Sequence, residues 1–173
     1  MNTKVLGYLN NFTLNLKTNK MTAAHLHAMI IHFPIALLMV GFLSEIIALF
    51  YNEDLFKKIA LYLLLLGAVG AIAAYVSGSY AAEGIETGRL AEAIETHEEA
   101  ALITLWLAII TAVFRAIIIF FKYERPWTKW VGILLFAALV GSIINTGNKG
   151  GKLVFEHGAG IELKLPEFNE NVQ

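Results

Sequence analysis

The chain of 173 residues is 57% apolar and 16% charged, whereas soluble domains carry about a quarter of charged residues. A formal net charge of −1 excludes the basic surface of a nucleic-acid-binding protein, so no nucleic-acid partner is expected. The absence of cysteine excludes a disulfide scaffold, thiol catalysis, cysteine-based zinc sites and iron–sulfur clusters.

Four apolar stretches follow one another along the chain, at residues 28–51, 59–82, 99–121 and 128–148. A bilayer core about 30 Å thick needs about 20 helical residues, so each stretch is long enough to cross it. The stretches are too long for strands and lack a polar face along one side. The sequence therefore predicts an all-α integral membrane protein with four transmembrane helices in a lipid bilayer.

Two short connections join the first two stretches and the last two, at residues 52–58 and 122–129. Short links make neighbouring helices antiparallel, so residues 25–148 are predicted to form an up-down four-helix bundle. The middle connection, residues 83–99, is longer and acidic. Within it, residues 89–99 are expected to form a short exposed helix.

The N-terminal tail, residues 1–24, contains no apolar run long enough for a signal peptide. We expect this tail to lie at the membrane surface, with Met21 as a second candidate start of translation. Four spans place both termini on one side of the membrane. Positive charge is concentrated in the two short connections, which predicts that they are cytoplasmic and that the termini are periplasmic, in a bacterial inner membrane.

The C-terminal tail, residues 149–173, is predicted on the same side as the N-terminus. The pair Gly150 and Gly151 is expected to end the fourth helix, as glycine commonly does. Two apolar runs flank a glycine-rich turn between residues 153 and 165. This pattern predicts a small hairpin resting on the end of the bundle.

All five histidines fall at one predicted membrane face, as His25, His27, His32, His97 and His157. Ionisable groups at the membrane edge are costly and usually functional, and imidazole is a common ligand of haem and of metals. The pair favoured for binding a haem b is His32 with His97, with His27 and His157 as further candidates. His27 and His32 are about 140° apart on a helix, so both face one haem only if Pro34 breaks the helix.

The favoured function is a b-type haem protein that transfers electrons with a quinone or a cytochrome partner. One alternative is a zinc, copper or iron site around His32 and His97, with Glu98 or Glu99 as added ligands. Another is a non-catalytic subunit of a larger, respiratory membrane complex. No nucleophile–base constellation or phosphate loop occurs, so an electron-transfer or accessory role is expected rather than a stand-alone enzyme.

Two charges lie inside the apolar stretches, Glu45 in the first and Arg115 in the third. Each follows a histidine, His27 or His97, by 18 residues, which is about 27 Å along a helix. Their depths therefore match, and a structural ion pair between the two helices is the simplest prediction. A proton or quinone site at that far face is the alternative.

A ridge of small residues recurs every four positions in the second stretch, as Gly70, Ala74, Gly78 and Ala82. Such ridges allow close helix packing, which is the expected role, and they can also leave a slot for a planar cofactor. Tyr75 and Tyr80 bring hydroxyl groups near the histidine face or anchor the helix at the interface.

Residues 27–37, His-Ala-Met-Ile-Ile-His-Phe-Pro-Ile-Ala-Leu, resemble the motif His-Pro-x-x-x-His-Phe-Pro-Ile-Ala-Leu of the bacterial membrane family domain of unknown function 2231. Residues 150–161 resemble its closing motif, Gly-Gly-x-Leu-Val-Tyr-x-His-Gly-x-Gly, and Ala28 and Phe155 depart from the two patterns. The resemblance extends over residues 26–161 and implies a four-helix membrane protein, often in cytochrome-rich settings. It also implies four signature histidines, His27, His32, His97 and His157.

Overall fold

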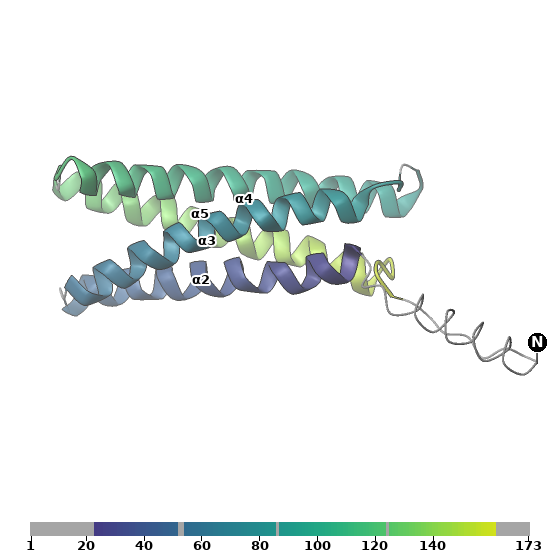
Figure 1. Ribbon diagram of the computed structural model, residues 1–173, viewed down its shortest axis with the longest axis horizontal. Coiled ribbons are helices and arrows are strands. Elements are labelled where there is room, and N and C mark those ends of the chain that lie inside the picture. Colours follow the sequence, from purple (N-terminus) through teal and green to yellow (C-terminus); the bar gives the residue numbers. More distant parts are fainter. Residues whose placement is uncertain (1–22, 52–53, 86, 124, 162–173) are drawn as a thin grey trace, which may run out of the picture.

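Four long helices make up the computed structural model, which describes residues 23–51, 54–85, 87–123 and 125–161 (Figure 1). The helices are α2 (Ala23–Tyr51), α3 (Asp54–Ala82), α4 (Arg89–Phe120) and α5 (Pro126–Phe155). Each is long and apolar enough to cross a membrane, and no strand occurs in these residues. The prediction of an all-α bundle of four transmembrane helices is confirmed.

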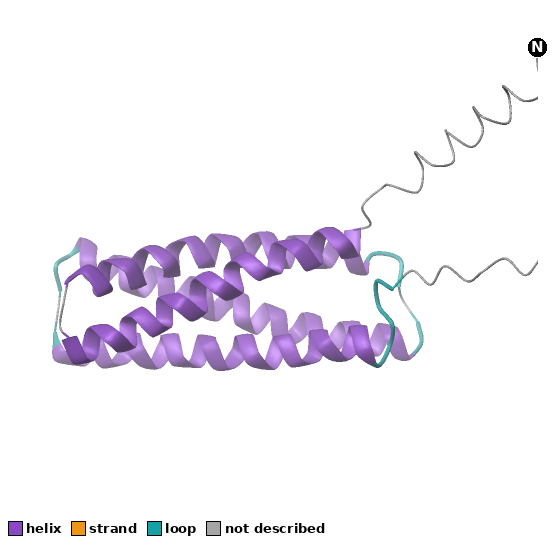
Figure 2. Cartoon of the chain, turned by 90° about the horizontal axis from the view of Figure 1, so that it is seen from below, coloured by secondary structure: helices purple, strands orange, loops and turns teal. Residues whose placement is uncertain are grey.

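Consecutive helices run antiparallel, which gives the up-down arrangement (Figures 1 and 2). The start of α2, the connection from α3 to α4 and the end of α5 meet at one end of the bundle. We call it the histidine end, and the opposite end the far end. Packing is most extensive between α2 and α3 and sparsest between α2 and α5, whereas the backbones of α2 and α4 make no close contact. Helices α2 and α4 therefore occupy diagonal corners of the bundle.

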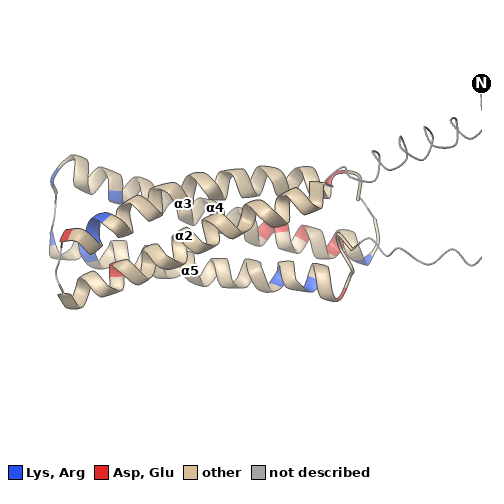
Figure 3. Cartoon of the chain, turned by 60° about the horizontal axis from the view of Figure 1, so that its bottom comes forward, with Lys and Arg blue, Asp and Glu red and all other residues tan. Residues whose placement is uncertain are grey.

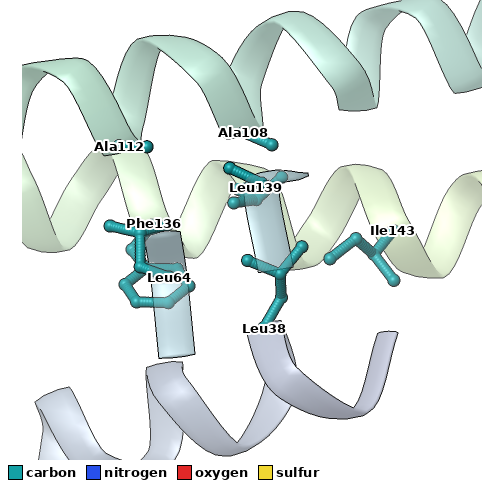
Figure 4. Packing of buried hydrophobic residues seen from close by; sticks show 8 residues of the cluster. Leu38, Leu64, Ala108, Ala112, Phe136, Leu139 and Ile143 are labelled. Atoms are coloured by element: carbon teal, nitrogen blue, oxygen red, sulfur yellow. The ribbon is translucent and has the colours of Figure 1, made fainter. Parts of the chain in front are cut away.

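The core lies midway along the bundle and joins all four helices (Figure 4). Its buried residues are Leu38, Leu64, Ala68, Ala108, Ala112, Phe136, Leu139 and Ile143. The small side chains of α4 leave room for the larger ones of its neighbours, and the ring of Phe42 packs edge-on against that of Phe136 at 5.4 Å between centroids. Charged residues of the described segments gather toward the two ends (Figure 3).

The small-residue ridge of α3 faces α2. A Cβ atom added at Gly67 would lie 2.6 Å from Cδ2 of Leu38, and one at Gly70 would lie 3.2 Å from Cβ of Pro34. Both distances are shorter than an ordinary van der Waals contact. The ridge therefore lets the two helices approach closely, and α2 continues as one helix through Pro34.

The helices extend beyond the apolar stretches because hydropathy marks the bilayer rather than the ends of helices. The separate short helix expected at residues 89–99 is instead the first part of α4. The pair at residues 150 and 151 does not end α5, because glycine keeps its backbone hydrogen bond in a helix at a cost of about 1 kcal/mol. The helix ends before Gly158, whose φ of 66° is the left-handed conformation of a helix-terminating glycine.

The hairpin expected at residues 153–165 is not present in its first half, since residues 153–155 are the last turn of α5. The amide groups of Gly158 and Ala159 donate hydrogen bonds to carbonyl oxygens of that turn, which satisfies acceptors that a strand would have used. The rest of the expected hairpin and the N-terminal tail expected over residues 1–24 lie outside the described residues, apart from residues 23 and 24, which begin α2.

Candidate functional site

An ion pair at the far end fixes the faces that α2 and α4 turn toward each other. Nη2 of Arg115 on α4 donates a hydrogen bond to Oε2 of Glu45 on α2 at 2.5 Å. Both side chains are largely buried, with 16% and 6% of their areas exposed. Because α2 and α4 are diagonal helices, the two side chains meet across the bundle axis. These are the two charges that the sequence assigned to a structural ion pair.

On both helices the charged residue of the ion pair is separated from a histidine by the same number of residues. Glu45 follows His27 by 18 residues, and Arg115 follows His97 by 18 residues. Eighteen residues at 3.6 per turn make five whole turns, so each histidine lies on the same helix face as its charged partner. His27 and His97 therefore lie on the helix faces that carry Glu45 and Arg115, about 27 Å along each helix from the ion pair.

The imidazole of His27 is oriented by α3. Its Nδ1 lies 2.9 Å from Oγ of Ser77, and that hydroxyl donates its one hydrogen to the carbonyl oxygen of Ala74, also at 2.9 Å. Ser77 must therefore accept a hydrogen bond from Nδ1–H of His27, which leaves Nε2 with a lone pair. A second hydrogen bond of this kind fixes the tautomer of metal-binding histidines. The ring packs on Gly78, where a Cβ atom would lie 3.0 Å from Cε1.

The imidazole of His97 is half-buried against α5. A Cβ atom at Gly150 would lie 3.2 Å from Cε1 of His97, so the absence of a side chain there makes room for the ring. Nδ1 of His97 is a buried nitrogen without a hydrogen-bond partner, and it is the one such side-chain atom in the described part of the chain. A Cβ atom at Gly150 would also lie 3.5 Å from Nδ1, so this side of the ring faces α5, where the backbone of Thr146 is close to the imidazole.

The other candidate histidines do not join this pair. His32 is exposed, and its Nδ1 donates to the carbonyl oxygen of Ala28 on its own helix. Since α2 is unbroken at Pro34, the angle of about 140° from His27 holds and turns His32 away from the axis. His32 is thus exposed on another face of α2 than His27, and the pairing of His32 with His97 as haem ligands stays a prediction.

His157 is half-buried in the turn after α5, and His25 is exposed in the first turn of α2. The turn lies close to the start of α2, because a Cβ atom at Gly160 would come within 3.4 Å of Cβ of Ala24. Among the residues that the structure describes, no group of three or more histidine or acidic side chains is placed to hold a metal ion. The arrangement that these residues form is a pair of imidazoles.

Two supporting residues were not identified from the sequence. Ser77 lies 50 residues from His27, and Gly150 is separated from His97 by most of α4 and α5. Nothing in the local sequence marks either contact. The sequence did contain a hint about His27 and His97. Each lies 18 residues from Glu45 or Arg115, and this spacing fixes the helix face as well as the depth of each histidine.

The model of a family described as predicted membrane proteins, DUF2231, matches residues 23–163. No curated protein and no solved structure matches the chain. The matched segment contains all four helices and both histidines of the pair.

Proposed function

The chain belongs to the DUF2231 family of predicted membrane proteins, and we propose that it is a membrane-embedded electron-transfer protein that binds a b-type haem between His27 and His97. The observation that carries this proposal is the position of His27 and His97 at the same end of two diagonal helices, each five turns from one partner of a buried ion pair. Helix bundles bind haem through histidines on facing helices.

The chemistry of the two rings fits the axial ligands of a haem. The tautomer set by Ser77 leaves Nε2 of His27 with its lone pair, and Nδ1 of His97 is buried without a partner. The chain has no cysteine, so a haem here would be held without covalent attachment. A haem held by these two imidazoles would supply one-electron chemistry rather than oxygen activation.

The chain's own residues would do three things for such a group. Ser77 orients one imidazole, Gly78 and Gly150 make room for the two imidazole rings themselves, and the apolar helices exclude water. Buried surroundings of this kind tune a redox group through low polarity and restricted solvent access. In this proposal the histidine end faces the periplasm of a bacterial inner membrane, because the short far-end connections concentrate the positive charge.

The test is a visible spectrum of the full chain purified in mild detergent, oxidised and then reduced with dithionite, with metal analysis of the same sample. We expect the sharp absorption band of a reduced b-type haem. His27→Ala and His97→Ala should each lose the band, whereas His32→Ala and His25→Ala should keep it. Far-UV circular dichroism checks that each variant retains its helices.

Other outcomes would contradict the proposal in different ways. A colourless protein with stoichiometric zinc or copper would favour the histidine metal site. A colourless and metal-free protein would favour the accessory subunit of a membrane complex. Loss of the band in His32→Ala but not in His27→Ala would favour haem while refuting the pairing inferred from the ion pair.

A further inference from the structure

A groove at the histidine end runs along the outer surface of α2 and α3. Its volume is about 600 Å³, within the usual range of small-ligand sites of about 300–1,000 Å³. Most of its wall is apolar, including Leu26, Ile30, Ile72 and Val76. Leu26, Ile72 and Val76 are 43%, 46% and 47% exposed in the bundle, so the groove opens toward the lipid, and a ligand would enter it from the bilayer.

The polar groups of the groove lie at one end of it. Ser77 and Tyr80 belong to the last two turns of α3, nearest the membrane face, whereas Val69 and Ile72 lie deeper in the span. Neither polar residue is charged, and no Lys, Arg, Asp or Glu contributes to the lining. The groove is therefore amphipathic along its length, with hydroxyl groups at the membrane edge and apolar side chains toward the bilayer centre.

Ser77 links the groove to the histidine pair. Ser77 is part of the groove wall, and its hydroxyl oxygen accepts the hydrogen bond from Nδ1 of His27. A group bound beside Ser77 would thus be separated from the His27 imidazole by one side chain. Nothing else in the described lining offers a comparable connection from the lipid to the interior of the bundle.

We propose that this groove binds an isoprenoid quinone of the membrane, with its ring beside Ser77 and Tyr80 and its tail along Ile72 and Ile30. A quinone is uncharged, its ring carries carbonyl oxygens that can accept the hydrogen of the Tyr80 hydroxyl, and its tail is apolar. Ser77 contributes no donor here, because its one hydrogen is bonded to Ala74. A phospholipid headgroup carries a phosphate, which proteins bind with cationic or multiple donor groups that this lining lacks. The role of the quinone as an electron partner rests on the proposed function, whereas its binding to the groove does not.

The test measures binding of decylubiquinone, a short-tailed quinone, to the full chain in nanodiscs by equilibrium dialysis and mass spectrometry. Ala73→Phe places a large ring in the lining and should weaken binding by about tenfold or more. Ala137→Phe adds the same ring at another exposed alanine, on α5, and should leave binding unchanged. Tyr80→Phe removes only a hydroxyl from an exposed side chain and should weaken binding by about fivefold.

Decylphosphocholine serves as the probe for a lipid occupant, because it has the same tail length and a phosphate headgroup. Equal displacement of decylubiquinone by this probe would overturn the proposal in favour of an acyl-chain groove. Equal binding of decylubiquinone to wild type, Ala73→Phe and Tyr80→Phe would also overturn it.

Haem content, measured separately on each sample, distinguishes this inference from the proposed function. Quinone binding that Ala73→Phe abolishes, in a protein without haem, would support the groove and refute the haem proposal. Haem retention without quinone binding would refute the groove alone.

Discussion

Replacing Glu45 by glutamine removes the charge that neutralises Arg115 inside the bundle. Both side chains are largely buried, and they are joined by a direct hydrogen bond between charged groups. Arg115 already packs closely against α5, because its Cδ atom lies 3.2 Å from where a Cβ atom of Gly132 would be. The guanidinium also cannot lose its charge, so Glu45→Gln leaves a buried cation without a counter-charge.

Breaking a buried ion pair from one side costs about 3–5 kcal/mol, and we expect that loss in the free energy of unfolding of Glu45→Gln. Arg115→Met should also destabilise the bundle, because it leaves the carboxyl group of Glu45 without its partner. The double variant Glu45→Gln/Arg115→Met leaves no buried charge and should be more stable than Glu45→Gln alone.

The assay is unfolding in a denaturing detergent, followed by far-UV circular dichroism. The matched control is Lys57→Gln, which removes one partner of the exposed ion pair with Asp54, at 3.2 Å in the first turn of α3. That change should cost at most about 1 kcal/mol. The free energy of unfolding of Glu45→Gln could instead lie within about 0.5 kcal/mol of the wild-type value, a margin typical of surface changes. That result would show that the ion pair does not hold α2 and α4 together.

Three further changes test the packing of the bundle with the same assay. Gly67→Ala should destabilise the bundle by about 1–3 kcal/mol, because its Cβ atom would lie 2.6 Å from Leu38. Gly141→Ala is the control. A Cβ atom there meets nothing within 4 Å, so this change should be neutral or stabilise the bundle by up to about 1 kcal/mol. Phe136→Ala, at 1% exposed area, should cost about 3–5 kcal/mol, and a loss below about 1 kcal/mol would show that the core collapses around the site. Gly158→Ala should cost about 1–2 kcal/mol because of its left-handed backbone, with faster amide hydrogen exchange confined to the last turn of α5.

The membrane-spanning helices could be predicted because a run of apolar residues is a local property. The ends of the helices could not, since they depend on backbone hydrogen bonding outside the bilayer. At the end of α5 the glycine pair at residues 150 and 151 is typical of a helix stop, yet Gly150 is helical and packs on His97 from α4. That contact joins residues far apart in the sequence, so no local sequence pattern predicts it.

The candidate site could be predicted only in part, because some of its features are local in the sequence and others depend on tertiary contacts. The sequence indicated the histidines, the matched depths of Glu45 and Arg115 and the small-residue ridge. It favoured His32 because this histidine lies about one turn inside the membrane edge, and it left open whether Pro34 breaks the helix so that His27 and His32 could face one haem. Packing of Pro34 against Gly70 is a tertiary contact, and it accompanies a helix that continues without interruption.

The ion pair and the two histidines on the diagonal helices differ in whether their polar groups already have partners. At the far end, the carboxylate of Glu45 and the guanidinium of Arg115 neutralise each other. At the histidine end, Nδ1 of His97 has no hydrogen-bond partner, whereas Nδ1 of His27 is bonded to Ser77. Because each helix places its two side chains five turns apart, a rotation of α2 that displaced His27 would also withdraw Glu45 from Arg115. The free energy of the ion pair, a few kcal/mol, therefore also opposes rotation of the histidines. The ion pair at the far end thus helps to preorganise the two histidines, as a ligand-binding site requires.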